Sequence, residues 1–561
     1  MKGVVHTILE GDTIEQIEME VLGVLPNTLG PKQDIILVKL LGKRAEFTGV
    51  VAGMSGSPAY VDGRLLGALS LRFGSFSKEA LAGVTPIQNV FDADRSSAVG
   101  TQRAAASADA PPEEQSANLR VPLPGEVASR LGLGEGAYLT RIDTPLVFSG
   151  FRPEVVQQFG RSFTPYGLVA TQGGTAAPAP DDSQLQPGQM VSIVLMKGDL
   201  SLQASCTVTA VVGDKIFVCG HPLFGYGEVE MPLARGRVVT TLASAFNSFK
   251  IVNAGGVIGS VTQDRITAVT ARLGAPPRLI PVELAIVSPA GTKQFRFEMM
   301  EHSKLTPLLA SMAVMNGLIA NTVYSEGMTF QLSGGIEIAG HTRVVLDNMF
   351  APTDQPVPDG FFLTLTVQSI FTRIFTNPYE RARIEKISLH VETIPERRSA
   401  TIESAWCDKS EVSPGEKIDV KVLLRPYRGA PVMHTVPIVI PLQATTGQLR
   451  VMVSDSETLN RMTRFFSSSP LSRLPGLEQL ITLLNRERRN NRLFVTLLQP
   501  TPTLLFEEKE LPNAPISQIN VLDQRRVPGS SLLLRESTVG EWSLPLNQVV
   551  SGQYLLTVTV K

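Results

Sequence analysis

Alternation of apolar and polar residues recurs along the chain and predicts a protein built mainly from β-strands. Residues 14–24 follow the period of two that is expected for a half-buried strand. A second, more buried strand is predicted at residues 34–40. The Asp62-Gly63 pair between two apolar runs predicts a hairpin, because this pair tolerates positive φ. We therefore expect residues 1–94 to form a small antiparallel barrel or one half of a sandwich.

The same period returns in the rest of the chain, with a further hairpin turn predicted at Gly213-Asp214. Strands are expected at residues 190–217, 281–287, 335–338, 361–367 and 554–560. Helical periodicity is confined to a few places. A short helix is expected at residues 153–159, and the clearest helix places four leucine or isoleucine residues at i, i+3, i+4 and i+7 within residues 477–484.

Composition divides the chain further. Residues 95–118 and 171–184 are rich in small and polar residues without an apolar period, which is typical of flexible linkers. At roughly 150 residues per domain, 561 residues predict about three or four domains. The expected parts are a barrel half (1–94), a linker (95–118), a second barrel half (119–290), a β-rich connecting region (291–395) and a C-terminal, immunoglobulin-like β-sandwich with a helical insertion (396–561).

Charge and composition exclude several classes of function. Charged residues make up 18% of the chain, against about 25% in typical proteins, so the chain can bury large cores. The net charge of −1 creates no field that gathers polyanions, and we expect no nucleic-acid binding. Three cysteines without C-x-x-C spacing and six scattered histidines predict no metal site, and no cofactor is expected. Residues 305–324 lack charge but contain proline and asparagine, so we expect a buried helix there and no integral membrane segment.

The hexapeptide Gly-Met-Ser-Gly-Ser-Pro at residues 53–58 is the strongest candidate for chemistry. A serine flanked by small residues on a tight turn has an unobstructed hydroxyl, and nearby backbone N–H groups can converge on the oxyanion that forms when it attacks a carbonyl. The alternative is a turn that merely needs small residues.

The hexapeptide resembles the G-D-S-G-G-P signature of chymotrypsin-like proteases and, more closely, the G-M-S-G-S-P motif of the SpoIVB-type serine peptidase family. In this chain as in the SpoIVB-type family, a few mostly apolar residues, an Asp-Gly pair and a G-A strand follow the motif. A second block resembles the family's G-D, T-V-T, G-D and G-H elements: Gly198-Asp199, Thr207-Val208-Thr209, Gly213-Asp214 and Gly220-His221-Pro222. The resemblance covers residues 1–92 and 187–275.

The resemblance implies a bacterial serine endopeptidase of signalling proteolysis, with a cleft between two β-barrel halves and a protein or peptide as substrate. Ser55 would be the nucleophile and His221 its general base, with the N–H groups of Gly53 and Ser55 as the oxyanion hole. Serine needs an adjacent imidazole because its hydroxyl is a weak acid. His341 is the nearest alternative base, and the remaining histidines are expected at the surface or in the core: His6, His302, His390 and His434.

The chain departs from the family in its order and in its acid. Ser55 precedes His221, the reverse of the sporulation members, so the two barrel halves are expected in permuted order; a triad is defined by geometry and not by chain order. Leu40 stands where those members carry an aspartate. Asp264 is the candidate replacement, unless it is a turn residue paired with its neighbour Arg265. The weaker alternatives are Asp34 and Asp199. The PDZ module of the sporulation members is not recognisable.

A second hypothesis is a catalytically inactive envelope scaffold that keeps the fold and binds proteins; the leucine at position 40 supports it. The C-terminal β modules are the expected partner surface under either hypothesis. The resemblance implies a periplasmic or other extracytoplasmic location with an upstream export signal, whereas the N-terminus, Met1-Lys2-Gly3, implies a cytoplasmic protein if it is the true start. Cys206 and Cys219 flank the second hairpin turn and form either a disulfide, in an oxidising compartment, or two small buried thiols.

Overall fold

The structure is a computed structural model, mainly β, with 53% of residues in strands and 17% in helices. It describes all residues except 75–78, 96–118, 135, 174–183, 245–246, 322–326, 467–475, 501–502, 507–508, 513–514, 516, 518–530 and 535. The chain divides into two compact units: the first contains residues 1–280 and 296–309, and the second contains residues 281–295 and 310–561.

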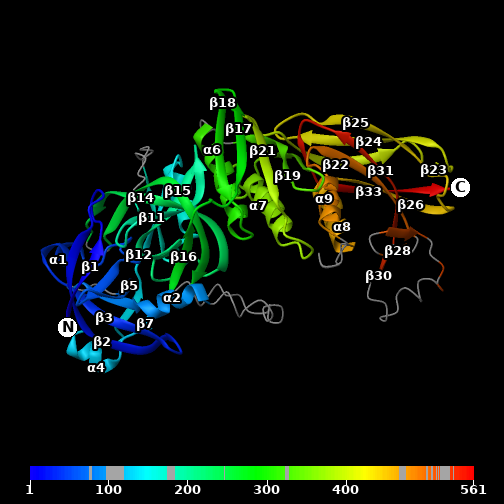
Figure 1. Ribbon diagram of the computed structural model, residues 1–561. Helices are drawn as coiled ribbons and strands as arrows, with labels where there is room; N and C mark the ends of the chain where they lie inside the picture. Colours follow the sequence, from blue (N-terminus) through cyan, green and yellow to red (C-terminus); the bar gives the residue numbers. More distant parts are fainter. Residues whose placement is uncertain are drawn as a thin grey trace. The chain divides into compact units, whose positions relative to one another are not determined.

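A closed six-stranded antiparallel barrel begins the first unit (Figure 1). Its strands are β1 (Lys2–Thr7), β2 (Glu15–Gly30), β3 (Gln33–Leu40), β4 (Pro58–Val61), β5 (Arg64–Phe73) and β6 (Leu81–Pro86). The ring closes because β1 pairs with β2 and β4, β3 with β2 and β6, and β5 with β4 and β6. Asp62 and Gly63 form the predicted hairpin turn, with φ of 49° and 74°. The barrel predicted from the alternation of residues is confirmed.

Six further strands of the same unit close a second ring of antiparallel pairs. They are β11 (Met190–Gly198), β12 (Ser201–Val212), β13 (Lys215–Val218), β14 (Gly227–Leu242), β15 (Phe249–Arg265) and β16 (Ala268–Leu273). Strand β12 pairs with β11 and β13, β16 with β13 and β15, and β14 with β11 and β15. The predicted strands and the turn at Gly213-Asp214 are confirmed.

One segment passes from the first ring to the second. Strand β8 (Tyr138–Arg141) pairs with β5 of the first barrel, and β9 (Thr144–Ser149) pairs with β12 of the second. Residues 141–144 therefore lie at the junction of the two barrels. Smaller elements of this unit are α1 (Lys43–Thr48), α2 (Ile87–Arg95), β7 (Val121–Pro122), α4 (Gly125–Arg130), α5 (Pro153–Gly160), η2 (Thr164–Tyr166) and β10 (Leu168–Gln172). Helix α5 confirms the prediction for residues 153–159.

The two linker predictions fall largely outside the described residues. Arg95 is the last residue of α2, and residues 96–118 are not described. In the second stretch, Thr171 and Gln172 belong to β10, and residues 174–183 are not described.

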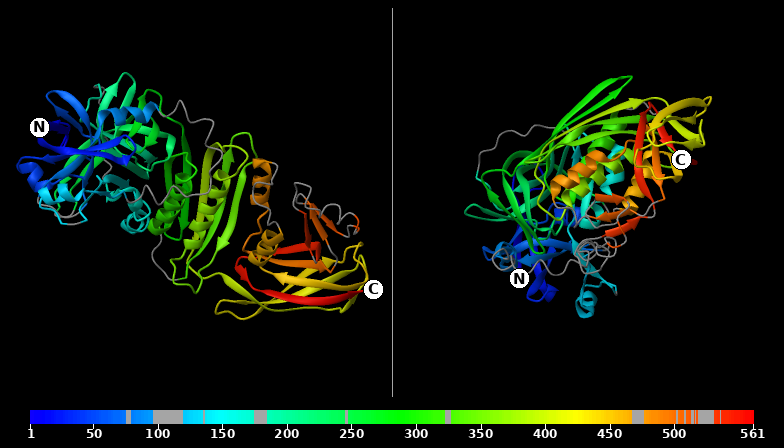
Figure 2. Two further views of the ribbon diagram at one scale, coloured as in Figure 1. Left: turned by 90° about the horizontal axis from the view of Figure 1, so that it is seen from below. Right: turned by 90° about the vertical axis from the view of Figure 1, so that its right-hand side faces the viewer.

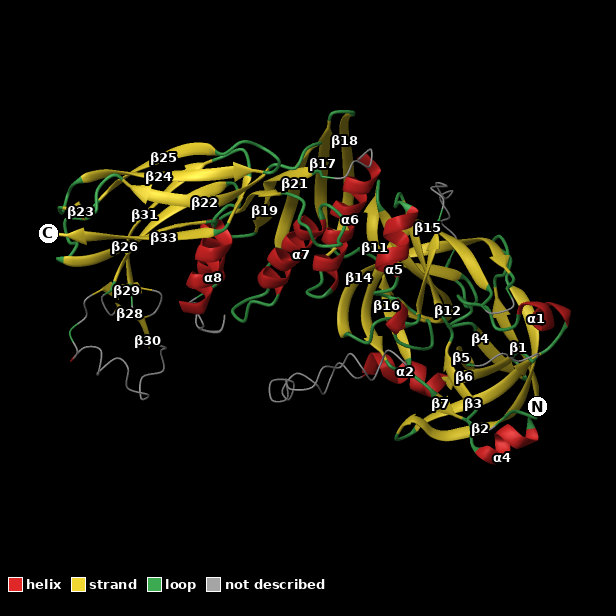
Figure 3. Ribbon diagram, turned by 180° about the vertical axis from the view of Figure 1, so that it is seen from behind, coloured by secondary structure: helices red, strands yellow, loops and turns green. Residues whose placement is uncertain are grey.

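After the barrels, the chain continues with β17 (Leu279–Ser288), β18 (Gly291–Met300), α6 (Leu305–Asn321), β19 (Thr329–Ile338), β20 (Val344–Phe350), α7 (Phe361–Phe375) and β21 (Ile384–Ile394). Strand β21 pairs in parallel with β17 and antiparallel with β19. Figure 3 shows α7 beside β19 and β21. Among the described residues, no helix is long and apolar enough to cross a membrane.

The strand predicted at residues 361–367 is wrong, because this segment begins the helix α7. The buried residues Leu363, Val367, Phe371 and Ile374 recur every three or four positions and form one helical face. Seven residues with alternating apolar positions satisfied a strand pattern, and only the continuation to residue 375 distinguishes the helix.

The C-terminal part of the second unit has two sheets on a shared apolar core (Figure 2). One sheet contains β22 (Ser399–Cys407), β24 (Lys417–Pro426), β25 (Val432–Val439) and β32 (Val549–Ser551); the other contains β23 (Glu411–Val412), β26 (Gly447–Ser454), β27 (Arg492–Gln499), β31 (Ser537–Pro545) and β33 (Gln553–Val560). The helices α8 (Ser456–Phe466) and α9 (Leu477–Arg486) are inserted between β26 and β27, and α9 confirms the predicted helix. A small separate sheet holds β28 (Thr503–Phe506), β29 (Lys509–Pro512) and β30 (Ser531–Leu534).

Candidate active site at the barrel junction

The serine-bearing hexapeptide at residues 53–58 lies between β3 and β4 of the first barrel and packs closely against the second barrel. Gly53 and Gly56 have φ of 94° and 90°, which favour glycine. A Cβ on Gly56 would lie 2.2 Å from the carbonyl oxygen of Thr207 and 2.5 Å from the backbone nitrogen of Cys219. The small residues of the motif are therefore required by a close approach between the barrels.

Two threonines of β12 hold this turn by its carbonyl groups. The backbone N–H of Thr207 donates to the carbonyl of Ser55 at 2.9 Å, and its hydroxyl donates to the carbonyl of Gly53 at 2.9 Å. The hydroxyl of Thr209 donates to the carbonyl of Gly56 at 2.7 Å. Side chains two apart in a strand share a face, so the Thr-Val-Thr sequence presents both hydroxyls to the serine turn.

His221 lies in the corresponding connection of the second barrel, between its third and fourth strands. The preceding residues Cys219 and Gly220 both have φ of 68°. A Cβ on Gly220 would lie 2.8 Å from the Cβ of Ala68, and the hydroxyl of Thr85 donates to the Gly220 carbonyl at 3.0 Å. Each of the two turns thus packs against the opposite barrel, and the structure brings them to one junction.

A disulfide between Cys206 and Cys219 joins the two halves of this arrangement, with 5.1 Å between the Cα atoms. Cys206 precedes Thr207 in β12, and Cys219 lies two residues before His221. Of the two alternatives left open by the sequence, the structure has the disulfide. The bond ties the strand that holds the serine turn to the turn that carries the histidine.

Burial sets the protonation state of the histidine. Ser55 is 0% exposed and His221 is 4% exposed. The Nδ1 atom lies 2.8 Å from the Pro222 carbonyl oxygen, so Nδ1 carries the proton and donates. Burial and, to a lesser extent, the positive charge of Arg141 lower the pKa of His221 to about 4, against the opposing effect of the Pro222 and Ile142 carbonyls. The ring is neutral at pH 7, with a lone pair on Nε2.

The serine hydroxyl and the histidine lone pair remain unpaired in this structure. Neither Ser55 Oγ nor His221 Nε2 has a hydrogen-bond partner, although both atoms are buried. The hydrogen bond between them that a nucleophile and its base require is therefore not formed. Catalytic hydrogen bonds are often long in structures without substrate and shorten when substrate binds.

Asp264 organises the loop after His221 without contacting the ring. The residue is the last but one of β15 and is buried; its Oδ1 accepts the Leu223 N–H at 2.7 Å, and its Oδ2 accepts the Phe224 and Gly225 N–H groups at 2.8 Å each. Burial raises the pKa of Asp264, while these N–H donors lower it. The carboxylate therefore fixes the backbone that follows Pro222, whose carbonyl holds Nδ1.

The alternative residues are not brought to this junction. Arg265 donates to Gln263 through Nε and forms no ion pair with Asp264 among the described residues. The Oδ1 of Asp34 accepts the Asn27 N–H, and the Oδ2 of Asp199 accepts the Arg296 N–H. His341 belongs to the second unit and lies between two glutamates there. Of the remaining histidines, His6 packs on Tyr60 and His302 on Tyr226.

Of the two backbone N–H groups expected to form the oxyanion hole, one is already hydrogen-bonded. The Gly53 N–H donates to the Asp143 carbonyl at 3.1 Å, so this group is already engaged. The Ser55 N–H has no hydrogen-bond acceptor in the described part of the chain. An oxyanion formed at Ser55 would find one free backbone donor from the turn itself.

Two buried cations at the junction were not among the candidates from the sequence. Arg141, which ends β8, is 7% exposed and shares the inward face of that strand with Leu139. Lys250 in β15 is 0% exposed, and its Nζ donates to the Thr7 hydroxyl at 2.9 Å. A Cβ on Gly53 would lie 3.3 Å from Cδ of Lys250, so the lysine stem packs against the serine turn. A charged residue at an inward position of a strand pattern was the one available signal.

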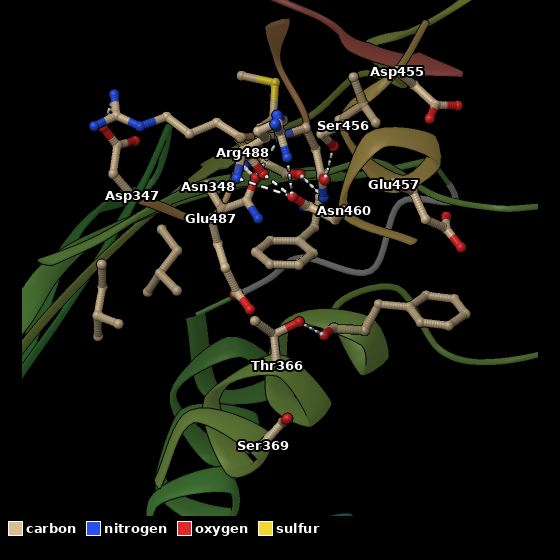
Figure 4. Close-up of a pocket in the computed structure, with 18 of the residues that line it drawn as sticks. Asp347, Asn348, Thr366, Ser369, Asp455, Ser456, Glu457, Asn460, Glu487 and Arg488 are labelled. Atoms are coloured by element: carbon tan, nitrogen blue, oxygen red, sulfur yellow. Dashed lines mark hydrogen bonds and ion pairs between the residues drawn. The ribbon is translucent and has the colours of Figure 1, made fainter. Parts of the chain in front are cut away.

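The second unit contains a cavity of about 880 Å³, where Thr366 and Ser369 of α7 lie across from Asn460 and Arg488 (Figure 4). Several of its polar side chains have partners. Arg488 pairs with Glu541 at 2.7 Å, and the Oδ1 and Oδ2 of Asp455 accept the N–H groups of Thr458 and Gly552. No buried nucleophile and base meet among the described residues that line it, so the barrel junction is the better candidate site.

The comparisons with known proteins give no relative. No protein-family model matches the chain, and neither the curated proteins nor the solved structures contain a match. The similarity to the SpoIVB-type peptidases therefore stays a prediction from motifs, and the functional argument depends on the geometry of the junction.

Proposed function

We propose that this protein is a serine endopeptidase of the SpoIVB type, with two chymotrypsin-like barrels in permuted order. The observation that carries the proposal is a pair of turns in corresponding places of two six-stranded rings. Each turn packs on the opposite barrel, and each carries a buried polar atom without a partner, Ser55 Oγ and His221 Nε2. Buried polar groups without partners are uncommon in folded proteins, and a catalytic role is one explanation for them.

In the proposed reaction, Ser55 Oγ attacks the carbonyl carbon of a peptide bond and its proton moves to His221 Nε2. The tetrahedral intermediate collapses, the C–N bond breaks, and the leaving amine takes the proton from Nε2. Water, activated by the same nitrogen, then hydrolyses the acyl group from Ser55. A neutral imidazole whose Nδ1–H is held by the Pro222 carbonyl is the form of histidine that a general base requires.

In this proposal Asp264 is the third residue of the catalytic triad, but it acts on His221 indirectly. Its oxygens hold the backbone of residues 223–225, and that backbone positions the Pro222 carbonyl that binds Nδ1. Because Ser55 and His221 are buried, substrate entry requires the residues that cover them to move. Substrate or a protein partner bound through the C-terminal sheets would supply the energy for that movement. The disulfide supports a periplasmic or extracytoplasmic location, since such bonds persist in oxidising compartments.

A non-catalytic scaffold is the second candidate. Two observations favour it: Ser55 and His221 form no hydrogen bond, and both oxygens of the Asp264 carboxylate already accept hydrogen bonds from backbone N–H groups.

Labelling with a fluorophosphonate tests the proposal. The wild-type protein should be labelled at residue 55, as mapped by mass spectrometry of the modified peptide. Ser55→Ala and His221→Ala should both lose the label. Ser57→Ala is the matched control, because Ser57 is a buried serine with an unpaired hydroxyl in the same turn. Absence of label in folded wild-type protein, with and without peptide substrates, would favour the scaffold.

A further inference from the structure

Arg141 is a buried cation without a partner at the candidate active site. Its side chain makes no hydrogen bond or ion pair in the described part of the structure, and its Nε is buried and unpaired. Burial lowers the pKa of Arg141 to about 10, and the guanidinium is therefore still charged at neutral pH. Nearby Arg72 also has a buried, unpaired Nε, but its terminal nitrogen pairs with Asp143 at 2.9 Å, whereas Arg141 has no such ion pair among the described residues.

Asp264 does not serve as the missing partner. Its charge acts on Arg141 through space and raises the arginine pKa. Both of its oxygens are occupied by the N–H groups of residues 223–225, and no ion pair joins the two side chains. A guanidinium offers five N–H donors in a planar fork that matches a carboxylate. Burying such a group without acceptors is unfavourable, and a bound anion would offset that cost.

The position of Arg141 directs that anion to the reacting atoms. The residue begins the segment that crosses from one barrel to the other. The next residues of this segment contact the first barrel and its serine turn: the Ile142 N–H donates to the Ser70 carbonyl, and the Asp143 carbonyl accepts the Gly53 N–H. The charge of Arg141 also reaches the imidazole of His221. The backbone two residues after Arg141 therefore contacts the serine turn, while the charge of the guanidinium acts on the histidine.

We propose that Arg141 is the recognition group for a carboxylate of the substrate, close to the scissile bond. The carboxylate belongs to an aspartate or glutamate side chain or to the C-terminus of the substrate chain. This inference rests on the proposed function, because it assigns a substrate class to that site. The proposed peptidase would accordingly prefer acidic peptides or cut near a free C-terminus.

Binding to Ser55→Ala protein tests the inference without requiring catalysis. Four dansyl-labelled peptides are compared by fluorescence anisotropy: Ala-Ala-Glu-Ala-amide, Ala-Ala-Gln-Ala-amide, Ala-Ala-Ala-Ala with a free carboxylate, and Ala-Ala-Ala-Ala-amide. Charge-assisted hydrogen bonds predict about 10- to 100-fold tighter binding of a carboxylate peptide than of its uncharged match. The glutamate pair and the terminal pair report separately on the two sources of the carboxylate.

Arg141→Met in the Ser55→Ala background should remove the acid preference, so that the ratio of the two dissociation constants is about 1. Arg141→Lys should keep part of the preference, because lysine retains the positive charge but not the planar guanidinium. Arg161→Met, at an exposed position of the same unit, is the control and should keep the full preference. If the methionine variant does not fold, as judged by circular dichroism, the four-peptide comparison and the lysine variant still decide the question.

Equal affinity for the acidic and uncharged peptides, or no measurable binding of any of the four at millimolar concentration, overturns the inference. So does a preference that persists in a folded Arg141→Met variant. The fluorophosphonate experiment separates this failure from failure of the proposed function. Labelling at Ser55 without acid preference refutes only the role of Arg141. Acid preference without labelling refutes the peptidase and the assignment to a scissile bond, and leaves Arg141 as a carboxylate-binding residue.

Discussion

Replacing the buried Lys250 with methionine should change how the stability of the first unit depends on pH. Burial lowers the pKa of Lys250 from 10.5 to about 7, against a small opposing effect of Glu15. The unfolded chain holds this proton to a higher pH than the folded chain does. The free energy of unfolding of the wild type should therefore rise as the pH rises from 7 to 10.5, with the full penalty present below pH 7.

At about 1.4 kcal/mol per pH unit, the penalty amounts to about 5 kcal/mol below pH 7 and to about 1 kcal/mol at pH 9.5. Lys250→Met removes it but leaves the Thr7 hydroxyl buried and unpaired, which costs about 1 to 3 kcal/mol. The variant should thus be more stable than the wild type at pH 7.5. That advantage should shrink by about 3 kcal/mol by pH 9.5.

Pulse proteolysis in urea at several pH values, with mass spectrometry of peptides from the first unit, measures this difference. Lys197→Met is the matched control, because Lys197 is an exposed lysine of β11 in the same unit. Its stability should follow the wild type in parallel at every pH. Parallel curves for Lys250→Met as well would refute the reasoning, because they would show that the amine is protonated equally in the folded and unfolded chain.

Four further predictions concern the barrel junction. Replacing Cys206 and Cys219 with alanine should lower the melting temperature in a calorimetric scan, by the equivalent of about 3 kcal/mol, because the disulfide closes a loop of sequence separation 13; an unchanged melting temperature would contradict this. Gly56→Ala should destabilise the fold by about 3 kcal/mol in urea denaturation and abolish fluorophosphonate labelling, since the Cβ would meet a carbonyl of β12. Asp264→Asn should slow labelling at least about tenfold, because its NH₂ group would oppose the loop N–H donors; an unchanged rate would remove this residue from the site. The labelling rate of the wild type should stay constant from pH 8 to about 5 and fall near pH 4, where His221 takes up a proton, whereas a fall near its ordinary pKa of 6.5 would show that the ring is solvated.

Local chemistry made parts of the fold predictable. The Asp62-Gly63 turn and the helix at residues 477–484 were predictable because each short sequence pattern is compatible with few local structures. The close packing around Gly56 is equally local in origin, because a glycine-rich turn signals a tight approach even when its neighbour is unknown. The disulfide was one of two alternatives, since the sequence placed its cysteines on either side of a hairpin without showing their directions.

Long-range geometry explains what the sequence did not reveal. Arg141 and Lys250 are both buried, and Lys250, in a strand of the second barrel, donates to Thr7 of the first, a contact between segments far apart in the sequence. Asp264 was selected by its spacing from His221, but the backbone donors that occupy its oxygens belong to a loop whose shape no pattern encodes. The first residues of α7 were predicted as a strand, because a short alternating stretch is compatible with both a strand and a helix until its packing is known.

The hydrogen bonds from Thr207 and Thr209 of β12 to the serine turn have a consequence for the order in which the chain is synthesised and folds. The first barrel is complete by residue 86 and contains Ser55, whereas the hydroxyl donors for its turn lie at residues 207 and 209 and the histidine follows at 221. A growing chain that folds from its N-terminus exposes the serine turn before any base exists to deprotonate it. If Ser55 is the nucleophile of the proposed peptidase, it is therefore made before its base, and an incomplete chain would lack the histidine needed to cleave its neighbours.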